Sequence, residues 1–343
     1  MLADGMKFGL FGGPQTHIGN LGPESGISYH EYGEYIVEAE KLGFSSSWLF
    51  EHHFSGFGQP SCSLNLLCYF SGITSKIRLG SAVLVIPWHN PILIAEQIGT
   101  LDVVSNGRYD FGVGRGYRDN EFKGFGINSG DAGSIYEESM NLILKAWSEK
   151  ERWSYKSDRW EFNDILIEPR PVQQPHPPLW QGAGSQDSIR RAAEQGYGLL
   201  LDQIISFDEI GERVKYYREV VESLGKEFDP NFIGVTRGFM PADNDKERRS
   251  AHQIRNQFIG TVRVLSAQND KKRGTHNIVG KVKDETEVSE KGAIIGNSEE
   301  MIERIQKLYD CGVRNVLLHD LTASKAGLQG FASNVMPKFL NKD

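Results

Sequence analysis

The chain has 343 residues, of which 39% are hydrophobic, and a formal net charge of −7. That length and hydrophobic content suit one large α/β domain or two small ones, and the negative charge argues against nucleic acid as the main partner. No stretch reaches the roughly 18 uninterrupted apolar residues of a membrane span, and we identify no signal peptide.

The three cysteines, Cys62, Cys68 and Cys311, are widely spaced and form no CxxC pair. This usage is typical of a reducing compartment and predicts a cytoplasmic protein. No group of residues has the spacing of a metal site.

Strand and helix patterns alternate along the chain. Eight strands are predicted at Lys7–Phe11, Ser47–Phe50, Arg78–Ile86, Tyr109–Val113, Pro178–Gln181, Gly198–Leu201, Phe232–Arg237 and Asn315–His319. Helices are predicted at about Tyr29–Leu42, Ser63–Thr74, Pro91–Val104, Asp131–Lys150, Ser185–Gln195, Asp208–Leu224, Asp243–Leu265 and Ser298–Asp310, and a last helix follows the eighth strand.

This order predicts a (β/α)₈ TIM barrel with insertions, spanning the whole chain as one domain. An open doubly wound sheet is the main alternative, but no GxGxxG opens a helix after the first strand. The sequence RWSYKSDRWEFNDILIEPRPVQQPHPP predicts a small β-excursion followed by an extended run. The charged segment 269–291 lacks a pattern, and a mobile lid and plain disorder are equally good interpretations of it.

Candidate site residues follow the predicted strands, where a barrel carries its chemistry. Glu51, His52 and His53 follow the second strand, and alternation predicts that only one of the two histidines points inward. Trp88 and His89 follow the third strand and His17 the first, where they either line a pocket or pack the rim.

Arg115 and Tyr117 follow the fourth strand within GRGYRDNEF. Arg115 could hold a phosphate by paired hydrogen bonds, or form a salt bridge with Asp119 or Glu121. After the fifth strand, QGAGSQDS places Ser185 and Ser188 at a helix start, where free N–H groups favour a phosphate. From the residues alone, N-capping by Ser185 is the preferred interpretation.

Several segments in this order resemble the bacterial luciferase-like, flavin-dependent monooxygenases. The resemblance covers about residues 6–339. It is strongest in LGFSSSWLFEHHF, in IRLGSAVLVIPWHNPILIAEQIGTLDVVSNGRYDFGVGRGYRDNEFKGFG, in EPRPVQQPHPPLWQGAGSQDSIRRAAEQGYG and in IIGNSEEMIERIQKLYDCGVRNVLL.

The resemblance implies an enzyme that binds reduced FMN at the C-terminal mouth of a TIM barrel. It implies a catalytic His52 with Glu51 beside it, and a non-proline cis peptide at Ala82-Val83 under the flavin ring. The implied cofactor-binding residues are Ala82, Val83, Arg115, Gly116, Tyr117, Gly182, Gly184, Ser185 and Ser188. Gly114 and Gly184 depart from the luciferase α chain, which has a reactive cysteine and an acidic residue there, so light emission is not expected.

The expected reaction uses O₂ and FMNH₂ from a separate flavin reductase, through a C4a-hydroperoxyflavin, to oxygenate a small aldehyde, ketone or alkane. A homodimer is expected by resemblance. Two alternatives stay open: an F420-dependent oxidoreductase on the same barrel, and a non-catalytic flavin-binding or supporting subunit.

Overall fold

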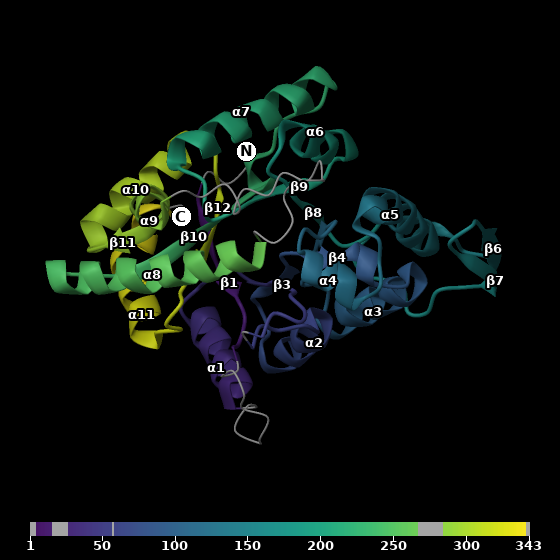
Figure 1. The fold of residues 1–343 in the computed structure, drawn as a ribbon, viewed down its shortest axis with the longest axis horizontal. Coiled ribbons are helices and arrows are strands. Elements are labelled where there is room, and N and C mark those ends of the chain that lie inside the picture. Colours follow the sequence, from purple (N-terminus) through teal and green to yellow (C-terminus); the bar gives the residue numbers. More distant parts are fainter. Residues whose placement is uncertain (1–4, 16–26, 57, 267–283, 341–343) are drawn as a thin grey trace.

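A closed barrel of parallel strands forms the centre of the molecule (Figure 1). The computed structural model describes residues 5–15, 27–56, 58–266 and 284–340. In chain order, the barrel strands are β1 (Lys7–Gly12), β2 (Ser46–Leu49), β3 (Arg78–Ser81), β5 (Tyr109–Gly114), β8 (Leu179–Gly182), β9 (Gly198–Leu201), β10 (Ile233–Pro241) and β12 (Asn315–His319). Pairing of β9 with β10, of β10 with β12 and of β12 with β1 closes the ring.

The helices surround this barrel in the manner that the alternating sequence predicts (Figure 1). They are α1 (Ile27–Lys41), α2 (Ser63–Ile73), α3 (Pro91–Val104), α4 (Asp119–Gly124), α5 (Ala132–Ser148), α6 (Gln186–Gln195), α7 (Phe207–Ser223), α8 (Asp245–Ser266), α9 (Glu285–Gly292), α10 (Ser298–Asp310) and α11 (Lys325–Asn334). The TIM-barrel prediction is confirmed, and the open sheet is excluded because the ring closes.

The strands are apolar because both of their faces are covered. Every residue of β2, β5 and β9 is buried, as expected of a parallel barrel between side chains inside and helices outside. Local signals fix the helix starts: Asn90 accepts hydrogen bonds from the backbone N–H groups of Ile92 and Leu93, and Pro91 occupies the first turn of α3.

Two indole rings fill the barrel interior. Trp48 and Trp180 meet edge to face with ring centroids 5.3 Å apart, and Leu200 and Leu317 pack against them. Gly80 leaves the space for the first indole, since a Cβ atom there would lie 2.2 Å from Trp48 Cε3. This indole layer, Trp48 and Trp180, fills part of the barrel interior.

The structure differs from the sequence prediction at four places. The third strand is interrupted: after β3 come β4 (Leu84–Val85) and a 3₁₀ turn (Ile86–Trp88), where Pro87 has no N–H to continue a ladder. Helix α4 forms within GRGYRDNEFKG, where the sequence predicted no helix. Its buried Phe122 packs on Trp88, with ring centroids 4.5 Å apart, and this contact stabilises the helix. A short strand, β11 (Ile294–Gly296), pairs in parallel with the last residues of β10.

The fourth difference concerns the segment 269–291. Its residues 269–283 lie outside the described residues, whereas α9 covers Glu285–Gly292. Asp284 caps this helix by accepting hydrogen bonds from the N–H groups of Thr286 and Glu287. The prediction of an unpatterned segment is therefore wrong for its last residues. The predicted β-excursion is the antiparallel hairpin of β6 (Trp153–Lys156) and β7 (Glu161–Ile165).

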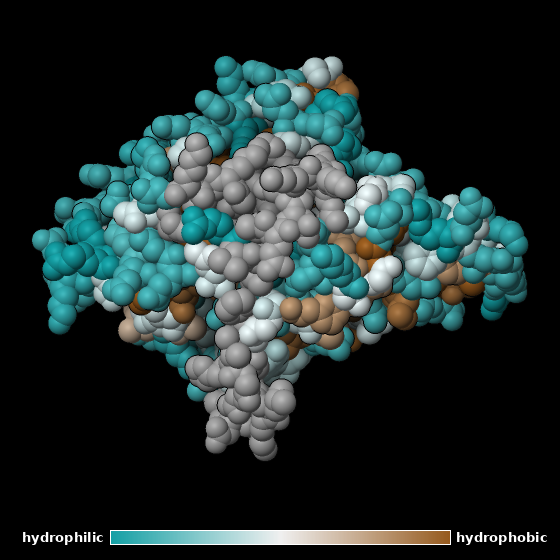
Figure 2. Space-filling model, viewed as in Figure 1, coloured by the Kyte–Doolittle hydropathy of each residue, from teal (hydrophilic) through white to brown (hydrophobic). Residues whose placement is uncertain are grey.

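The surface of the face drawn in Figure 2 is unevenly polar. Hydrophilic residues dominate over α6, α7 and α10, while hydrophobic residues gather toward α3, α4 and α5 (Figures 1 and 2). Within the described residues, no helix is long and apolar enough to cross a membrane.

Candidate active site

A cavity of about 330 Å³ opens at the C-terminal ends of the strands, above the indole layer. All the site residues named from the sequence resemblance line it, namely Glu51, His52, Ala82, Val83, Arg115, Gly116, Tyr117, Gly182, Gly184, Ser185 and Ser188. They come from the ends of β2, β3, β5 and β8, which are neighbours in the barrel. The topology thus brings together residues that are up to 137 positions apart in the chain (51 to 188).

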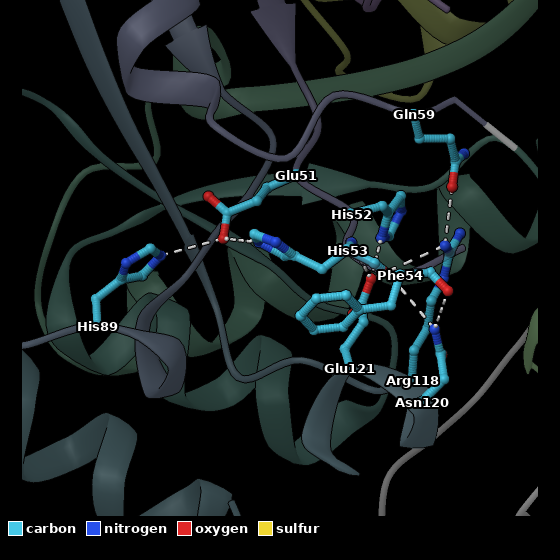
Figure 3. Close-up of polar contacts among 9 residues, drawn as sticks. All are labelled: Glu51, His52, His53, Phe54, Gln59, His89, Arg118, Asn120 and Glu121. Carbon is cyan, nitrogen blue, oxygen red and sulfur yellow. Dashed lines mark hydrogen bonds and ion pairs between the residues drawn. The ribbon is translucent and has the colours of Figure 1, made fainter. Parts of the chain in front are cut away.

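A buried carboxylate with two imidazole partners lies at the β2 end. Glu51 Oε1 accepts hydrogen bonds from His53 Nε2 at 3.2 Å and His89 Nε2 at 3.1 Å (Figure 3). Its other oxygen accepts from the Ser63 hydroxyl at 3.1 Å. Burial alone raises the pKa of Glu51, but these hydrogen bonds and the nearby imidazoles outweigh it and hold the pKa below its usual value.

Of the two adjacent histidines, His52 lines the cavity and His53 does not, as alternation predicts. His53 extends toward Glu51, whereas His52 lies beside Glu121 (Figure 3). Glu121 Oε1 accepts from the His53 backbone N–H at 2.9 Å and from His52 Nδ1 at 3.0 Å. A carboxylate only accepts, so His52 carries its proton on Nδ1 and keeps Nε2 as an acceptor.

The surroundings of His52 also keep it uncharged. Its burial and the positive charge of Arg118 lower its pKa, and the hydrogen bond to Glu121 only partly offsets this. Arg118 itself is 1% exposed and donates to Gln59 Oε1 at 3.0 Å. His52 is therefore a neutral base at the wall of the cavity near neutral pH.

Arg115 has no hydrogen bond or ion pair with the described part of the chain. The salt bridge to Asp119 or Glu121 that the sequence left open is absent, because Glu121 serves His52 and His53 instead. Burial and the nearby Arg191 lower the pKa of Arg115. A half-buried guanidinium without a partner, facing a cavity, is suited to an anionic ligand.

The start of α6 lies in the same cavity. Ser185 and Ser188 form a capping box: the Ser188 N–H donates to Ser185 Oγ at 3.2 Å, and the Ser185 N–H to Ser188 Oγ at 3.0 Å. The capping interpretation of Ser185 is thus confirmed. The N–H groups of Gln186 and Asp187, in the first turn, have no hydrogen-bond partner in the part of the chain that the structure describes, and a ligand could accept from them.

Small residues shape the cavity between these two ends. The expected cis peptide bond at Ala82-Val83 is present, and both residues line the cavity. A Cβ atom on Gly114 would lie 2.4 Å from Val83 Cγ2, so glycine at this position lets the Val83 side chain occupy that space. Trp88 packs on Phe125 and His89 bonds to Glu51, so both support the rim rather than the cavity wall. His17 lies outside the described residues.

Several cavity residues were missed from the sequence. Phe11 lies at the end of β1 and Gln203 follows β9, so the strand-end rule could have found both. Thr236 lies within β10, where that rule does not apply. Phe258 and Val262 reach the cavity from α8, and nothing in their sequence signals it.

Comparison with known proteins agrees with this geometry. A model of the family described as luciferase-like monooxygenase matches residues 6–315. The chain belongs to the luciferase-like monooxygenases. An alkanal monooxygenase alpha chain from Photorhabdus luminescens is 27% identical over 222 residues, 65% of this chain and 60% of that protein. The chain thus spans about three fifths of the length of this relative.

Other similar proteins differ in the cofactor that their names state. The oxygenase component of a flavin-dependent trigonelline monooxygenase from Acinetobacter baylyi is 24% identical over 97% of this chain and 96% of its own. The oxygenating constituent of 3,6-diketocamphane monooxygenase from Pseudomonas putida, solved with FMN, has a TM-score of 0.79 at 19% identity, covering 98% of this luciferase-like chain and 100% of its own. An F420-dependent secondary alcohol dehydrogenase has a TM-score of 0.78 at 17% identity, with the same coverage. These two structures share the fold.

Proposed function

We propose that this luciferase-like monooxygenase is the oxygenase component of a two-component system. It takes FMNH₂ from a separate reductase and uses O₂ to oxygenate a small organic substrate. One observation supports this above the others. A single cavity holds an unpaired guanidinium beside a free helix N-terminus at one end, and a neutral imidazole backed by a buried carboxylate at the other.

The residues present fit the phosphate and ring of FMN. Arg115 and the free N–H groups at the start of α6 would hold the phosphate, since both offer donors to an anion. Gly182 and Gly184 leave room for the ligand, and Ala82, Val83, Gly116 and Tyr117 would border the ring. When bound, the reduced flavin supplies the electrons that activate O₂.

His52 provides the proton acceptor. Glu121 fixes its tautomer, so Nε2 can take a proton from a group in the cavity and return it. Glu51 acts beside it by holding His53 and His89, which keeps the β2 loop in place. The apolar part of the cavity, including Phe11, Phe50 and Val85, limits the access of water to the reacting groups.

The test is binding of reduced flavin by wild-type protein and by Arg115→Met. We expect anaerobic titration to show FMNH₂ binding that weakens about tenfold or more in the variant, because a half-buried charged donor is lost. Arg190→Met is the matched control: Arg190 is on the same helix as the phosphate site, but it is exposed and paired with Asp187 and Glu194.

Two further readouts separate the alternatives. Tight binding of coenzyme F420 without FMNH₂ binding would contradict the proposal in favour of a deazaflavin enzyme. Binding of FMNH₂ whose reoxidation by O₂ proceeds at the rate of free flavin would instead favour a non-catalytic flavin-binding subunit.

We also propose a homodimer. Exposed hydrophobic side chains lie on α2 and α3: Tyr69, Ile73, Leu93, Val103 and Val104. Such a surface supports association with a second copy. Light scattering at micromolar concentration tests it, and a monomer mass would contradict it.

A further inference from the structure

The half of the cavity wall away from Arg115 and His52 has a different character. Its lining residues come from β9 and the segment that follows it, from β10 and β1, and from α8. Its side chains are mostly apolar: Phe11, Leu200, Ile204, Phe258 and Val262. Three polar residues interrupt it, Asp202, Gln203 and Thr236. The Asp202 carboxylate is already engaged, since it accepts from the Ile204 N–H at 2.8 Å and pairs with Arg213. If the flavin occupies the other half, as the proposed function requires, this wall faces the substrate.

A buried arginine fixes Gln203. Arg255 of α8 is 0% exposed, and its Nη1 donates to Gln203 Oε1 at 2.9 Å while its Nη2 donates to the Gln203 carbonyl at 2.8 Å. Burial lowers the pKa of Arg255 to about 10, so it stays charged near neutral pH. Because a guanidinium only donates, the amide atom that it contacts is the oxygen.

His319 holds the same oxygen from the other side. Its Nδ1 lies 2.9 Å from Gln203 Oε1, and its ring packs edge-on against Phe11 and Phe258. Burial and the charge of Arg255 lower the pKa of His319 to about 3, so the ring is neutral. Since Oε1 accepts, His319 must carry its proton on Nδ1, and it gives Gln203 a second donor.

With both donors on its oxygen, the amide can turn only its nitrogen toward a ligand. Gln203 Nε2 has no hydrogen-bond partner in the described part of the chain, and Gln203 lines the cavity. We propose that Gln203 is a specificity-determining residue whose fixed NH₂ group donates a hydrogen bond to an oxygen acceptor of the substrate, such as a carbonyl.

This inference deepens the proposed function and rests on it. Among aldehydes, ketones and alkanes, it selects the carbonyl compounds. An alkane would displace water from the N–H donors of Gln203 and offer no acceptor in its place, which lowers its affinity. A carbonyl oxygen accepts a hydrogen bond from these donors and so replaces the displaced water.

The experiment compares two ligands of equal shape: methyl butyl ketone, and the alkene in which a methylene group replaces its oxygen. Each is titrated calorimetrically, without O₂, into protein saturated with FMNH₂. We expect wild-type protein to prefer the ketone by roughly tenfold or more. In Gln203→Glu this preference is expected to disappear or reverse, because the carboxylate still accepts from Arg255 and His319 but places an acceptor where the NH₂ group was.

Gln253→Glu is the matched control, since Gln253 is exposed on α8 and the variant adds the same charge. It should keep the ketone preference. Gln203→Met, which removes the donors without adding charge, should also lose it. Equal wild-type affinity for the two ligands, or a preference that survives in Gln203→Glu, would overturn the inference. Failure of the proposed function is seen separately, as absent FMNH₂ binding in the preceding titration.

Discussion

At the residue scale, His52 owes its properties to two neighbours that act in opposite directions. Glu121 orients the ring and favours its protonated form, while Arg118 and burial favour the neutral form. The lowered pKa shows that the second influence is stronger. His52 is thus neutral at neutral pH and could accept a proton there.

This balance predicts the acid limit of activity. His52 must be neutral to accept a proton, so the rate falls as pH drops through its lowered pKa, below the ordinary value of about 6.5. Removing the charge with Arg118→Gln raises that pKa, so we expect the acid limb of kcat/KM to move up by about one pH unit.

The control is Gln59→Met, which removes the partner of Arg118 but leaves its charge. Its acid limb should stay close to the wild-type position. If the acid limb of kcat/KM did not move in Arg118→Gln, His52 would not control the reaction.

His52→Ala should lower the rate about 100-fold and leave the FMN affinity nearly intact. Single-turnover kinetics measures the rate, and an FMN titration measures the affinity.

At the element scale, α6 and α7 both start with a capping box in which serine is the N-cap residue, and of these two α6 starts at the cavity. Ser185 with Ser188 caps α6, and Ser206 with Glu209 caps α7. Ser185→Ala and Ser206→Ala should each lower the free energy of unfolding by about 1 kcal/mol, measured by urea denaturation. Only Ser185→Ala should also weaken FMN binding. Equal FMN affinity in both variants would show that Ser185 only caps the helix and does not contribute to FMN binding.

The strand β3 provides a second test at this scale. Gly80 faces Trp48 so closely that a Cβ atom would overlap the indole ring. Gly80→Ala should therefore destabilise the protein by about 1–3 kcal/mol, because the indole layer cannot shift without moving Trp180. Thermal unfolding measures this, with Gly72→Ala on α2 as the control, where no atom lies within 4 Å. A Tm unchanged by Gly80→Ala would mean that the indole layer is loosely packed.

The elements show what a single sequence can and cannot predict. Long periodic helices such as α3, and strands buried on both faces such as β5, are correctly predicted because their signals are local. Helix α4 is missed because it is only six residues long and its apolar contact, Phe122 on Trp88, is tertiary. The cavity residues of β2, β5 and β8 were found because strand ends converge. The partners Glu121, Arg118 and Arg255 act through contacts that no spacing in the sequence encodes.

At the scale of the whole molecule, the buried and neutral side chain of His319 makes the free energy of unfolding depend on pH. The folded-state pKa of His319 is about 3, below its unfolded value of about 6.5. The unfolded chain thus binds a proton that the folded protein excludes. The stabilisation is complete above about pH 6.5 and is lost as pH falls toward 3.

We expect the free energy of unfolding to fall by about 2 kcal/mol between about pH 6.5 and about pH 5 from this residue alone. His319→Gln keeps an amide donor for Gln203 but cannot titrate, so its decline should be smaller by that amount. Urea denaturation at several pH values measures both slopes, with His30→Gln, on the exposed side of α1, as control. If the free energy of unfolding declined equally with falling pH in wild-type protein and in His319→Gln, the lowered pKa of His319 would be contradicted.

The indole layer has an optical consequence. Ala82 and Val83 pack against the cluster of Trp48, Trp180, Leu200 and Leu317, so a flavin bound over that peptide would lie near the barrel's own fluorophores. Indole emission overlaps flavin absorption, and energy transfer is efficient at such short range. Occupancy of the mouth should then dim the intrinsic fluorescence of the protein, which would let cofactor arrival and departure be followed without a label.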